Sequence, residues 1–296
     1  MSEKSNIAWT DASWNPVTGC SRVSEGCSHC YAETLSLRFG WSKKPWTAQN
    51  AAENVVLHPG RLGQPLRWRK PRRVFVNSMS DLFHELVPDE FIDQVFAVMA
   101  LAPQHSFLIL TKRPQRMRDY AARQHRIFRA DGDLHVPRLA VAAQTMKWAG
   151  TVLAAEFPLV WPLPNCWLGV SVEDQATADQ RIPILLASSA AIRFVSCEPL
   201  LGAVDLQRFM CSNWPYHESI DPDHQCIDGY QHRLDWVIVG GESGANFRPM
   251  NLDWARSLVA QCRHRAGVAV FFKQASGLRP GMPSGDKELD TAKEFP

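Results

Sequence analysis

Three cysteines fall within eleven residues in the stretch Thr18-Gly19-Cys20-Ser21-Arg22-Val23-Ser24-Glu25-Gly26-Cys27-Ser28-His29-Cys30-Tyr31, with the spacing C-x6-C-x2-C. Glycine tolerates backbone angles that other residues avoid, so Gly19 and Gly26 allow this segment to turn back on itself. A Cys-x-x-Cys pair can place two sulfurs on one metal ion, and Cys20 is close enough in the chain to join them. The stretch therefore predicts a metal-binding loop.

The number and type of ligands in this loop favour iron over zinc. Zinc normally takes four ligands, but no fourth Cys or His follows at finger spacing, and His29, between two ligands, would have to point away. Three thiolates with one open position suit a [4Fe–4S] cluster whose fourth iron binds another group. Zinc binding, and cysteines that are free or form a disulfide, remain as alternatives.

On both sides of the cysteines, short apolar runs alternate with helical patterns. Because each run is apolar throughout, we expect strands covered on both faces, as in parallel βα units. Strands are predicted within 7–17 and at 73–77, 107–110, 166–170, 192–196, 235–239 and 267–272. Helices are predicted at 31–39, 88–101, 114–123, after Glu173 with a kink or restart at Pro183, and after a cap at Asn251. Residues 40–72 are predicted to be irregular.

A polar residue stands at or near the predicted carboxyl end of every strand. These residues are Cys20, Asn77, Lys112, Glu173, Glu198, Glu242 and Lys273. In barrels and open α/β sheets this edge holds the active site. The predicted fold is α/β, a partial or nearly closed parallel (β/α) barrel of about six to seven strands. A barrel would gather these residues at one mouth, whereas an open sheet would spread them along a line.

One domain is expected over residues 1–275, with insertions at about 124–165 and 207–233 and an extended tail at 276–296. The first insertion includes an Ala-rich helical segment at about 138–156. The second insertion contains Cys211, His217, His224, Cys226 and His232. Their spacing fits no zinc module, but it leaves a second metal site open as a hypothesis.

Composition limits the class of protein. The chain has 296 residues, 45% of them hydrophobic, and a formal net charge of +2, so any basic patch for nucleic acid must be local. The polar N-terminus has no signal-peptide core, and no apolar run approaches the length that spans a bilayer. We therefore expect a cytoplasmic protein with no membrane association, whose eight cysteines are ligands or core residues.

Several phrases of the sequence carry a resemblance to a known family. They are WNPVTGC at 14–20, GCSHCYAE at 26–33, VNSMSDLFHE at 76–85, LTKRP at 110–114, GVSVED at 169–174 and VIVGGESG at 237–244. Over residues 7–275 the chain resembles the phage Gp37/Gp68 family, also called DUF5131. Its cysteine-rich loop after a first strand also resembles the radical SAM superfamily, whose usual spacing is C-x3-C-x2-C, with a wider first spacing in some branches.

The resemblance implies two cofactors. Cys20, Cys27 and Cys30 would hold three irons of a [4Fe–4S] cluster, and the fourth iron would take the amino and carboxylate groups of S-adenosylmethionine (SAM). One electron from a reductase, flavodoxin or ferredoxin would cleave SAM and release a 5′-deoxyadenosyl radical, while the protein supplies position and shelter. The residues expected to contact the cofactors are Tyr31, Asn77, Ser78, Ser80, Asp81, Ser171, Glu173, Arg181, Gly240, Gly241 and Glu242.

Three segments carry the SAM assignments. Residues 77–81 stand where the superfamily often has Gly-Gly-Glu, so that their side-chain oxygens could substitute for it. Ser171-Val172-Glu173 followed by Arg181 matches a superfamily pattern, and Arg181 is expected to pair bidentately with the methionine carboxylate. Gly240-Gly241-Glu242 lies on a later strand, where its glycines would let the backbone approach adenine or substrate.

Further residues are expected to act on the substrate. His84, Lys112, Arg113, Glu198 and Lys273 are predicted to contact it, and Cys197 to donate a hydrogen atom to a product radical. Plainer alternatives stand beside these roles. Lys112 and Arg113 would also suit a solvated helix start, Glu198 and Glu242 would suit salt bridges between loops, and Cys197 would suit a small core residue.

The expected function is a radical SAM enzyme that acts on a nucleic-acid base or lesion, for example in DNA photoproduct repair. The basic, Trp-containing stretch 61–73 and the arginines at 113, 116, 118 and 123 could track phosphates while rings stack on bases. One rival is a non-enzymatic iron–sulfur or zinc protein that binds DNA. The other is a radical SAM enzyme acting on a small metabolite or a partner protein. The sequence leaves the oligomeric state open.

Overall fold

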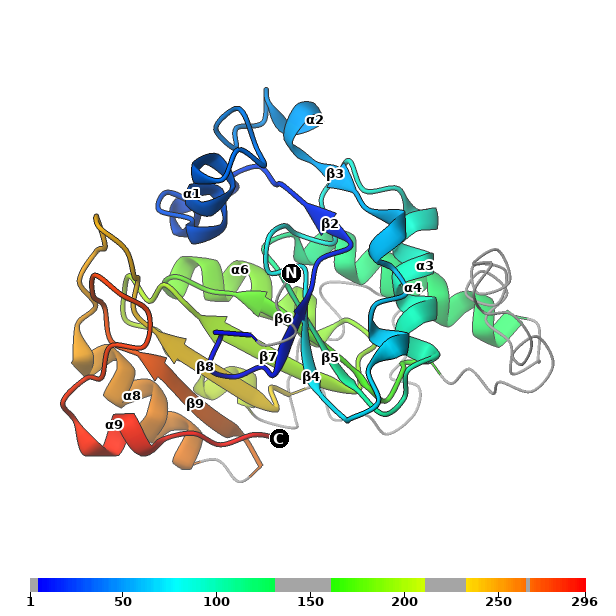
Figure 1. Cartoon of the computed structure of the whole chain (residues 1–296). Helices are drawn as coiled ribbons and strands as arrows, with labels where there is room; N and C mark the ends of the chain where they lie inside the picture. The colour runs from blue at the N-terminus through cyan, green and yellow to red at the C-terminus, as the bar shows by residue number, and fades with distance from the viewer. Residues whose placement is uncertain (1–4, 131–160, 211–232, 265–266) are drawn as a thin grey trace. The chain divides into compact units, whose positions relative to one another are not determined.

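A computed structural model describes residues 5–130, 161–210, 233–264 and 267–296 (Figure 1). The fold is α/β, built on a parallel seven-stranded sheet with the order β1-β4-β5-β6-β7-β8-β9. The strand numbers rise along the sheet without reversal, as in a singly wound βα barrel and unlike a doubly wound sheet. Because β1 and β9 are end strands, the sheet is not closed within the described residues. The predicted class, with its parallel strands, is confirmed.

The chain divides into two compact units. The first comprises residues 1–23, 32–168 and 189–191, and the second comprises residues 24–31, 169–188 and 192–296. Strand β6 (Cys166–Ser171) contributes residues to both. In the part of the chain that the structure describes, no helix combines the length and hydropathy needed to cross a bilayer.

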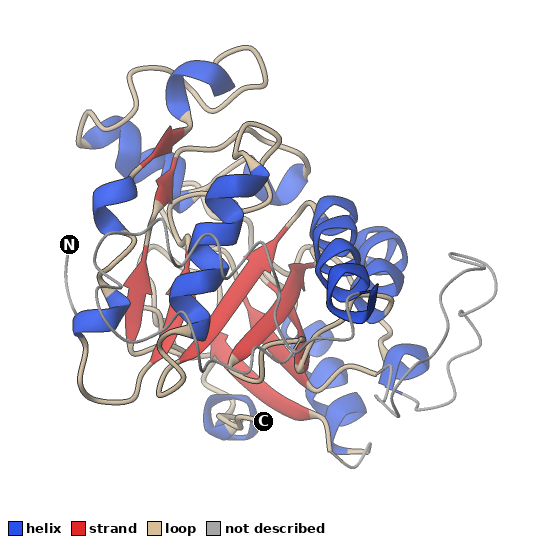
Figure 2. Ribbon diagram, turned by 90° about the vertical axis from the view of Figure 1, so that its right-hand side faces the viewer, coloured by secondary structure: helices blue, strands red, loops and turns tan. Residues whose placement is uncertain are grey.

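In the first unit, β1 (Ala12–Trp14), β4 (Arg73–Val76) and β5 (Ser106–Thr111) pair in parallel. Helices α3 (Asp89–Ala100) and α4 (Pro114–Ala130) follow β4 and β5, and Figure 2 shows helices flanking the strands of the sheet. The two helices pack through Phe96 and Tyr120, whose ring centroids lie 5.1 Å apart. The Tyr120 hydroxyl also donates to Asp93 over 2.8 Å, which fixes the rotation of α4 against α3.

Between β1 and Cys20 the chain leaves the main sheet. Strand β2 (Val17–Thr18) pairs antiparallel with β3 (Val56–Leu57), so the prediction that Cys20 directly follows a strand of the main sheet is wrong. Gly19 makes this detour possible, because its φ is +81° and a Cβ there would lie 1.8 Å from the Asn54 carbonyl oxygen.

The segment that was predicted to be irregular holds several short elements. They are α2 (Ala51–Asn54), β3, and the 3-10 helices η2 (Pro59–Arg61) and η3 (Pro65–Arg67). Helix α1 (Tyr31–Arg38) precedes them, as expected from the sequence. Prolines at the starts of η2 and η3 supply the fixed φ that suits a first helical turn.

In the second unit, β7 (Ile192–Cys197), β8 (Trp236–Gly240) and β9 (Ala269–Gln274) pair in parallel. Its other elements include η1 (Glu25–Cys27), α6 (Gln175–Leu186), η4 (Gln207–Met210) and α8 (Leu252–Arg263). Asn251 caps α8 as predicted, since its side-chain oxygen accepts from the Asp253 amide over 2.9 Å. Helix α6 runs on through Pro183, so the predicted restart there is wrong.

The C-terminal tail is not simply extended, contrary to the prediction. It contains α9 (Lys287–Thr291), capped by Asp286, with Leu289 fully buried. Beyond α9, the Ala292 carbonyl accepts from Phe272 over 2.8 Å and the Glu294 amide donates to Val270 over 2.9 Å. The tail therefore covers the otherwise open edge of β9, which protects it from pairing with other chains.

The predicted insertions can be compared with the structure only in part. Helix α4 continues to Ala130, beyond the predicted helix end at 123 and into the range predicted as the first insertion. The Ala-rich segment at 138–156 and the cysteines and histidines predicted as a second metal site (Cys211, His217, His224, Cys226 and His232) lie outside the described residues.

Candidate functional site

The described cysteines fall into two groups. Cys166, Cys197 and Cys262 are buried, whereas Cys20, Cys27 and Cys30 are half-buried, and all six are free thiols. Cys20 belongs to the first unit, and Cys27 and Cys30 belong to the second. No group of three His, Cys, Asp or Glu residues poised to hold a metal is found among the described residues. The loop cysteines are thus set apart by their exposure, because a packing role explains the buried group alone.

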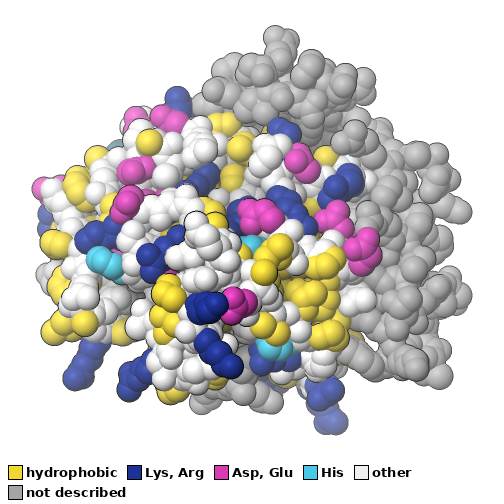
Figure 3. Space-filling model, turned by 90° about the horizontal axis from the view of Figure 1, so that it is seen from above, with side chains coloured by type: hydrophobic (Ala, Val, Ile, Leu, Met, Phe, Trp, Pro, Cys, Tyr) yellow, Lys and Arg dark blue, Asp and Glu magenta, His cyan; other side chains and the backbone are white. Residues whose placement is uncertain are grey.

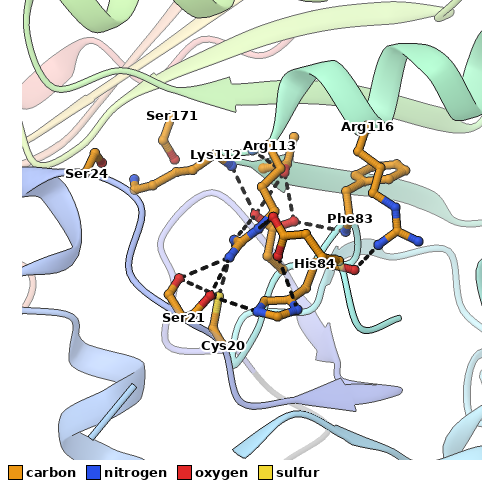
Figure 4. A network of polar contacts seen from close by, with 12 residues as sticks. Cys20, Ser21, Ser24, Phe83, His84, Lys112, Arg113, Arg116 and Ser171 are labelled. Atoms are coloured by element: carbon orange, nitrogen blue, oxygen red, sulfur yellow. Dashed lines mark hydrogen bonds and ion pairs between the residues drawn. The ribbon is translucent and has the colours of Figure 1, made fainter. Parts of the chain in front are cut away.

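A network of polar contacts surrounds Cys20 (Figure 4). Figure 4 shows the Arg113 side chain pointing toward Ser21 and Cys20. Its Nη2 donates to the carbonyl oxygen of Ser21 over 3.1 Å and to the Ser21 Oγ over 2.9 Å, and its Nη1 lies 3.5 Å from the Cys20 Sγ. Burial alone would lower the pKa of Arg113, but Asp81, Cys20 and Glu85 raise it. A permanent positive charge therefore lies beside the Cys20 sulfur.

Asp81 holds that guanidinium in place. Its carboxylate accepts from the Thr111 hydroxyl over 2.7 Å, from the amides of Phe83 and Lys112, and from Arg113 Nη1 over 3.2 Å. The side chains of Asp81 and Arg113 are 8% and 6% exposed. The pair joins the segment after β4 to the segment after β5, and it directs the Arg113 side chain toward Ser21 and Cys20.

His84 also faces the interior. Its Nδ1 accepts from the Leu86 amide over 3.1 Å, so the proton is assigned to Nε2, which donates to the Ser21 Oγ over 2.9 Å. Burial, followed by the charge of Arg113, lowers the pKa of His84. A neutral imidazole of this tautomer orients Ser21, the residue after Cys20, and cannot deprotonate it.

Hydrogen bonds connect the loop at residues 77–81 to residues 15–17, which precede Cys20. Asn77, with φ of 61°, accepts from the Val17 amide through its Oδ1, and the Ser80 hydroxyl donates to the Val17 carbonyl. Ser78 bonds to Asn15, so the side-chain oxygens of these predicted SAM contacts already serve the fold. Asn77 Nδ2 is different, since it is a buried donor with no acceptor among the described residues.

Glu173 anchors the loop that carries Cys27 and Cys30. The Ser24 hydroxyl donates to its Oε1 over 3.0 Å, and a Cβ on Gly26 would lie 2.3 Å from the same oxygen. Arg181 Nη1 donates to the Glu173 carboxylate over 3.0 Å and to the Ser171 carbonyl over 2.8 Å. Arg181 is only 4% exposed. Arg181 therefore pairs with a carboxylate of the chain itself, and its predicted contact with a methionine carboxylate stays a prediction.

Glu242 holds the same loop from a second side. His29 Nδ1 lies 3.0 Å from its Oε2, and Arg248 donates to both carboxylate oxygens. Arg248 also donates to the Glu25 carbonyl over 3.1 Å. Although burial raises the pKa of Glu242, the bonds from Arg248 and His29 lower it to about 2. Glu173 and Glu242, which follow β6 and β8, therefore both hold residues 24–29 through hydrogen bonds.

The remaining predicted residues of the second unit also have partners inside it. Glu198 and Lys273 form an ion pair, in agreement with the salt-bridge alternative for Glu198, and Lys273 lies within β9 instead of after it. The Gly240 and Gly241 positions are filled by the chain itself. A Cβ on Gly241 would lie 2.3 Å from the Ser276 amide, and one on Gly240 would lie 3.3 Å from the Glu198 side chain.

Cys197 and Tyr31 lie in contrasting environments. Cys197 is 0% exposed within β7, and burial raises the pKa of its thiol. This burial matches the core-residue alternative for Cys197. Tyr31 is 46% exposed as a whole residue and immediately follows Cys30 at the start of α1, but burial raises the pKa of its phenol.

The four arginines at 113–123 that were expected to track phosphates are paired with carboxylates. Arg113 pairs with Asp81 and Glu85, Arg116 and Arg123 pair with Asp89, and Arg118 pairs with Asp119. On the face seen in Figure 3, Lys and Arg side chains lie among Asp and Glu side chains. This arrangement does not resemble the continuous basic stripe of a nucleic-acid interface.

The exposed basic run lies at the other end of β4 from the Cys20 network. Arg67, Arg69 and Lys70 are exposed and precede the strand, whereas Asn77 follows it. Four residues at a rise of about 3.3 Å separate the two ends by about 13 Å. The run therefore does not share an edge of the sheet with Cys20.

Sequence reasoning missed several residues that position the cysteine loops. Asn15 accepts from the Met79 amide over 2.9 Å and fixes the 77–81 loop, and Thr111 orients Asp81. Both lie inside the family phrases WNPVTGC and LTKRP, which were a signal that could have pointed to them. Arg248 lies outside every phrase, so nothing in the sequence pattern marked it.

The comparisons with known proteins give one match. Residues 4–291 match the family model described as "Protein of unknown function (DUF5131)", which confirms the predicted family. No curated protein and no solved structure matches the chain.

Proposed function

The chain belongs to the DUF5131 family, and on this premise we propose that it is a radical SAM enzyme. Cys20, Cys27 and Cys30 would bind three irons of a [4Fe–4S] cluster, and SAM would bind at the carboxyl ends of the parallel strands. When bound, such a cluster supplies the electron for reductive cleavage of SAM. The electron would come from a reductase, flavodoxin or ferredoxin.

The observation that carries the proposal is the condition of the three cysteines. They form no disulfide and are half-buried, unlike the buried cysteines of the core. Their loops are held by buried charged groups, Arg113 beside Cys20 and Glu173 and Glu242 beside residues 24–29. Such rigid support is what ligand loops need, because surrounding hydrogen bonds orient the ligands of a metal centre.

The chain's own residues would prepare the site in separate ways. The guanidinium of Arg113 would offset the negative charge that three thiolates bring to a cluster. The unpaired Nδ2 of Asn77 would donate to an oxygen of SAM, since it is a buried donor that lacks an acceptor among the described residues. Exposed Tyr31 would lie beside the ligand that precedes it in the chain.

The proposal is tested by anaerobic reconstitution with iron and sulfide. We expect about four irons per chain, an EPR signal after reduction with dithionite, and formation of 5′-deoxyadenosine from SAM. Single Ala substitutions at Cys20, Cys27 and Cys30 should each abolish 5′-deoxyadenosine. The matched control is Cys262→Ala, which removes a buried thiol of α8 and should leave the iron content unchanged.

Two results would overturn the proposal. Tight binding of zinc through the three thiols, with no cluster after reconstitution, would end the iron–sulfur assignment. A complete cluster that never cleaves SAM would favour the non-enzymatic alternative, an iron–sulfur protein that binds DNA.

The proposed substrate is a nucleic-acid base or lesion, with a small metabolite or a partner protein as the alternative. A nucleic-acid substrate should bind with an affinity that falls as salt rises, with a slope of about −0.7 to −0.9 per phosphate contacted. If SAM is cleaved but DNA and RNA show no salt-dependent binding, the metabolite or protein substrate is the better assignment.

A further inference from the structure

The end of helix α1 (Tyr31–Arg38) places two aromatic rings in solvent. The Trp41 amide donates to the Ser36 carbonyl over 2.8 Å, the Gly40 amide donates to the Leu37 carbonyl over 3.2 Å, and Gly40 has a φ of +69°. This is the Schellman helix end, in which the residue after the glycine usually packs against an apolar side chain of the last turn. Here the residue whose carbonyl accepts from Trp41 is Ser36, which is polar. Trp41 therefore has no apolar partner at this position, and its side chain is exposed.

The exposed rings form a pair. Trp41 is 62% exposed and Phe39 is 57% exposed, and their ring centroids lie 5.2 Å apart with an interplanar angle of 29°. Single exposed apolar side chains are ordinary on protein surfaces. Two large rings that stack on each other while more than half of each remains in water are not, and such rings offer π surface to a flat ligand.

The segment of chain that carries the pair is rich in positive charge. Residues 34–52 contain Arg38, Lys43 and Lys44 and no Asp or Glu. Lys44 pairs with Glu53 over 2.6 Å, but Arg38 and Lys43 are exposed and have no carboxylate partner in the described parts of the chain. The Arg38 guanidinium lies 5.7 Å from the centroid of the Phe39 ring, which leaves its outer N–H groups available to an anion.

From these observations we propose that Phe39 and Trp41, flanked by Arg38 and Lys43, bind single-stranded nucleic acid, with bases stacked on the rings and phosphates on the cations. Aromatic rings beside unpaired cations are the combination that binds single strands without reading sequence. A duplex keeps its base faces inside the stack, so it cannot use the rings in this way.

The position of the surface relates it to the cysteine loop. Helix α1 begins directly after Cys30 and has eight residues, which at about 1.5 Å per residue span about 12 Å. The aromatic pair therefore follows Cys30 along the chain by the length of one short helix. The inference rests on the proposed function in one respect, since it names single-stranded nucleic acid as the substrate class of that site.

The test is fluorescence anisotropy of the full-length protein with a labelled oligothymidylate of about 15 nucleotides, a single-stranded RNA and a duplex of the same length. We expect both single strands to bind more tightly than the duplex. Trp41→Ala and Phe39→Ala should each weaken binding about 5- to 150-fold, which corresponds to about 1–3 kcal/mol for one stacked base. Trp41→Phe should retain most of the affinity, and Trp41→Leu should lose it, because leucine is apolar but has no π face.

Two control variants keep the assignment specific. Leu278→Ala removes another exposed apolar side chain and Lys70→Ala removes a cation before β4, and neither should change single-strand affinity more than twofold or so. Affinity lost in Lys70→Ala but kept in Trp41→Ala would overturn the inference in favour of the basic run. Full affinity in Trp41→Leu would overturn it in favour of an apolar docking face for a protein.

Binding is measured with and without reconstituted iron, so that the two proposals can fail separately. Single-strand binding that depends on Trp41 without any 5′-deoxyadenosine would leave this surface standing and remove the radical SAM function. 5′-Deoxyadenosine formation without single-strand binding would support the radical SAM function and rule out this binding surface.

Discussion

The guanidinium Nη1 of Arg113 lies 3.5 Å from the Sγ of Cys20, and the ion pair that Arg113 forms with Asp81 is almost fully buried. A fixed positive charge beside a cluster ligand favours the reduced, more negative state of the cluster. We therefore expect Arg113→Met to lower the reduction potential of the reconstituted protein, as measured by an EPR-monitored redox titration. Arg113→Lys should leave the reduction potential close to the wild-type value because it keeps the positive charge.

A control separates this effect from general loss of charge. Arg118→Met removes a cation from α4, the helix that follows Arg113. Arg118 pairs with Asp119 and not with Cys20, so this change should leave the potential unchanged. Arg113→Met also leaves Asp81 buried without its partner, which should cost about 3–5 kcal/mol of stability in urea unfolding. An unchanged potential in folded Arg113→Met would show that the contact has no electrostatic effect on the cluster.

Glu242 gives a prediction about pH. In the folded protein its pKa is lowered to about 2, because Arg248 and His29 bond to its carboxylate. In the unfolded chain it has the ordinary value of 4.5. The ionised group therefore adds stability that is fully present above about pH 4.5 and is lost as the pH falls toward 2. Glu242→Gln should lower the free energy of unfolding by about 2 kcal/mol at neutral pH.

The difference between wild type and Glu242→Gln should narrow as the pH falls from 4.5 toward 2, because protonation removes the charge from the wild-type residue. Urea unfolding of both proteins across that range is the measurement. A difference that stays constant with pH would mean that the shape of the side chain, and not its charge, holds the loop.

Gly26 is predicted to be required for its lack of a side chain. A Cβ there would lie 2.3 Å from Glu173 Oε1, and Glu173 is 1% exposed and held by Arg181, so it cannot yield. Gly26→Ala should displace residues 24–29, reduce the iron bound on reconstitution and cost about 1–3 kcal/mol of stability. Gly60→Ala is the matched control, since a Cβ at Gly60 would meet nothing within 4 Å. Equal iron content in the two variants would contradict this account of the loop.

The sequence predicted the parallel strands well because their signal is local. Runs such as Val237-Ile238-Val239 are apolar throughout, and all three side chains are 0% exposed in β8. The helix after Asn251 was likewise predictable from its cap. Strand β2 was not predicted, because its partner β3 lies far along the chain. The close approach of Asn54 to Gly19, which accompanies the departure of the chain from the main sheet, is likewise not visible in the sequence.

The sequence drew attention to charged residues near the cysteine loop, but it did not reveal their contacts. The pattern pointed to Glu173, Arg181 and Glu242 as charged groups after the strands, and all of them are at the base of the cysteine loop. Their partners are set by tertiary packing, so the sequence could not show that Arg181 would meet Glu173 before any ligand. Burial explains the pairing of Arg181 with Glu173, because a buried charge needs a partner within the protein.

The C-terminal tail supports a last prediction about stability. Leu289 of α9 is 0% exposed, and residues after it bond to the edge of β9. Leu289→Ala should leave a cavity and cost about 2–4 kcal/mol, measured as a lower urea midpoint with an unchanged slope. Leu278→Ala, in the same tail but 69% exposed, should change stability by no more than about 0.5 kcal/mol. Equal stability of the two variants would mean that α9 does not pack on the sheet in solution. The tail would then be the extended segment that its polar composition suggests, and the edge of β9 would be open to other chains.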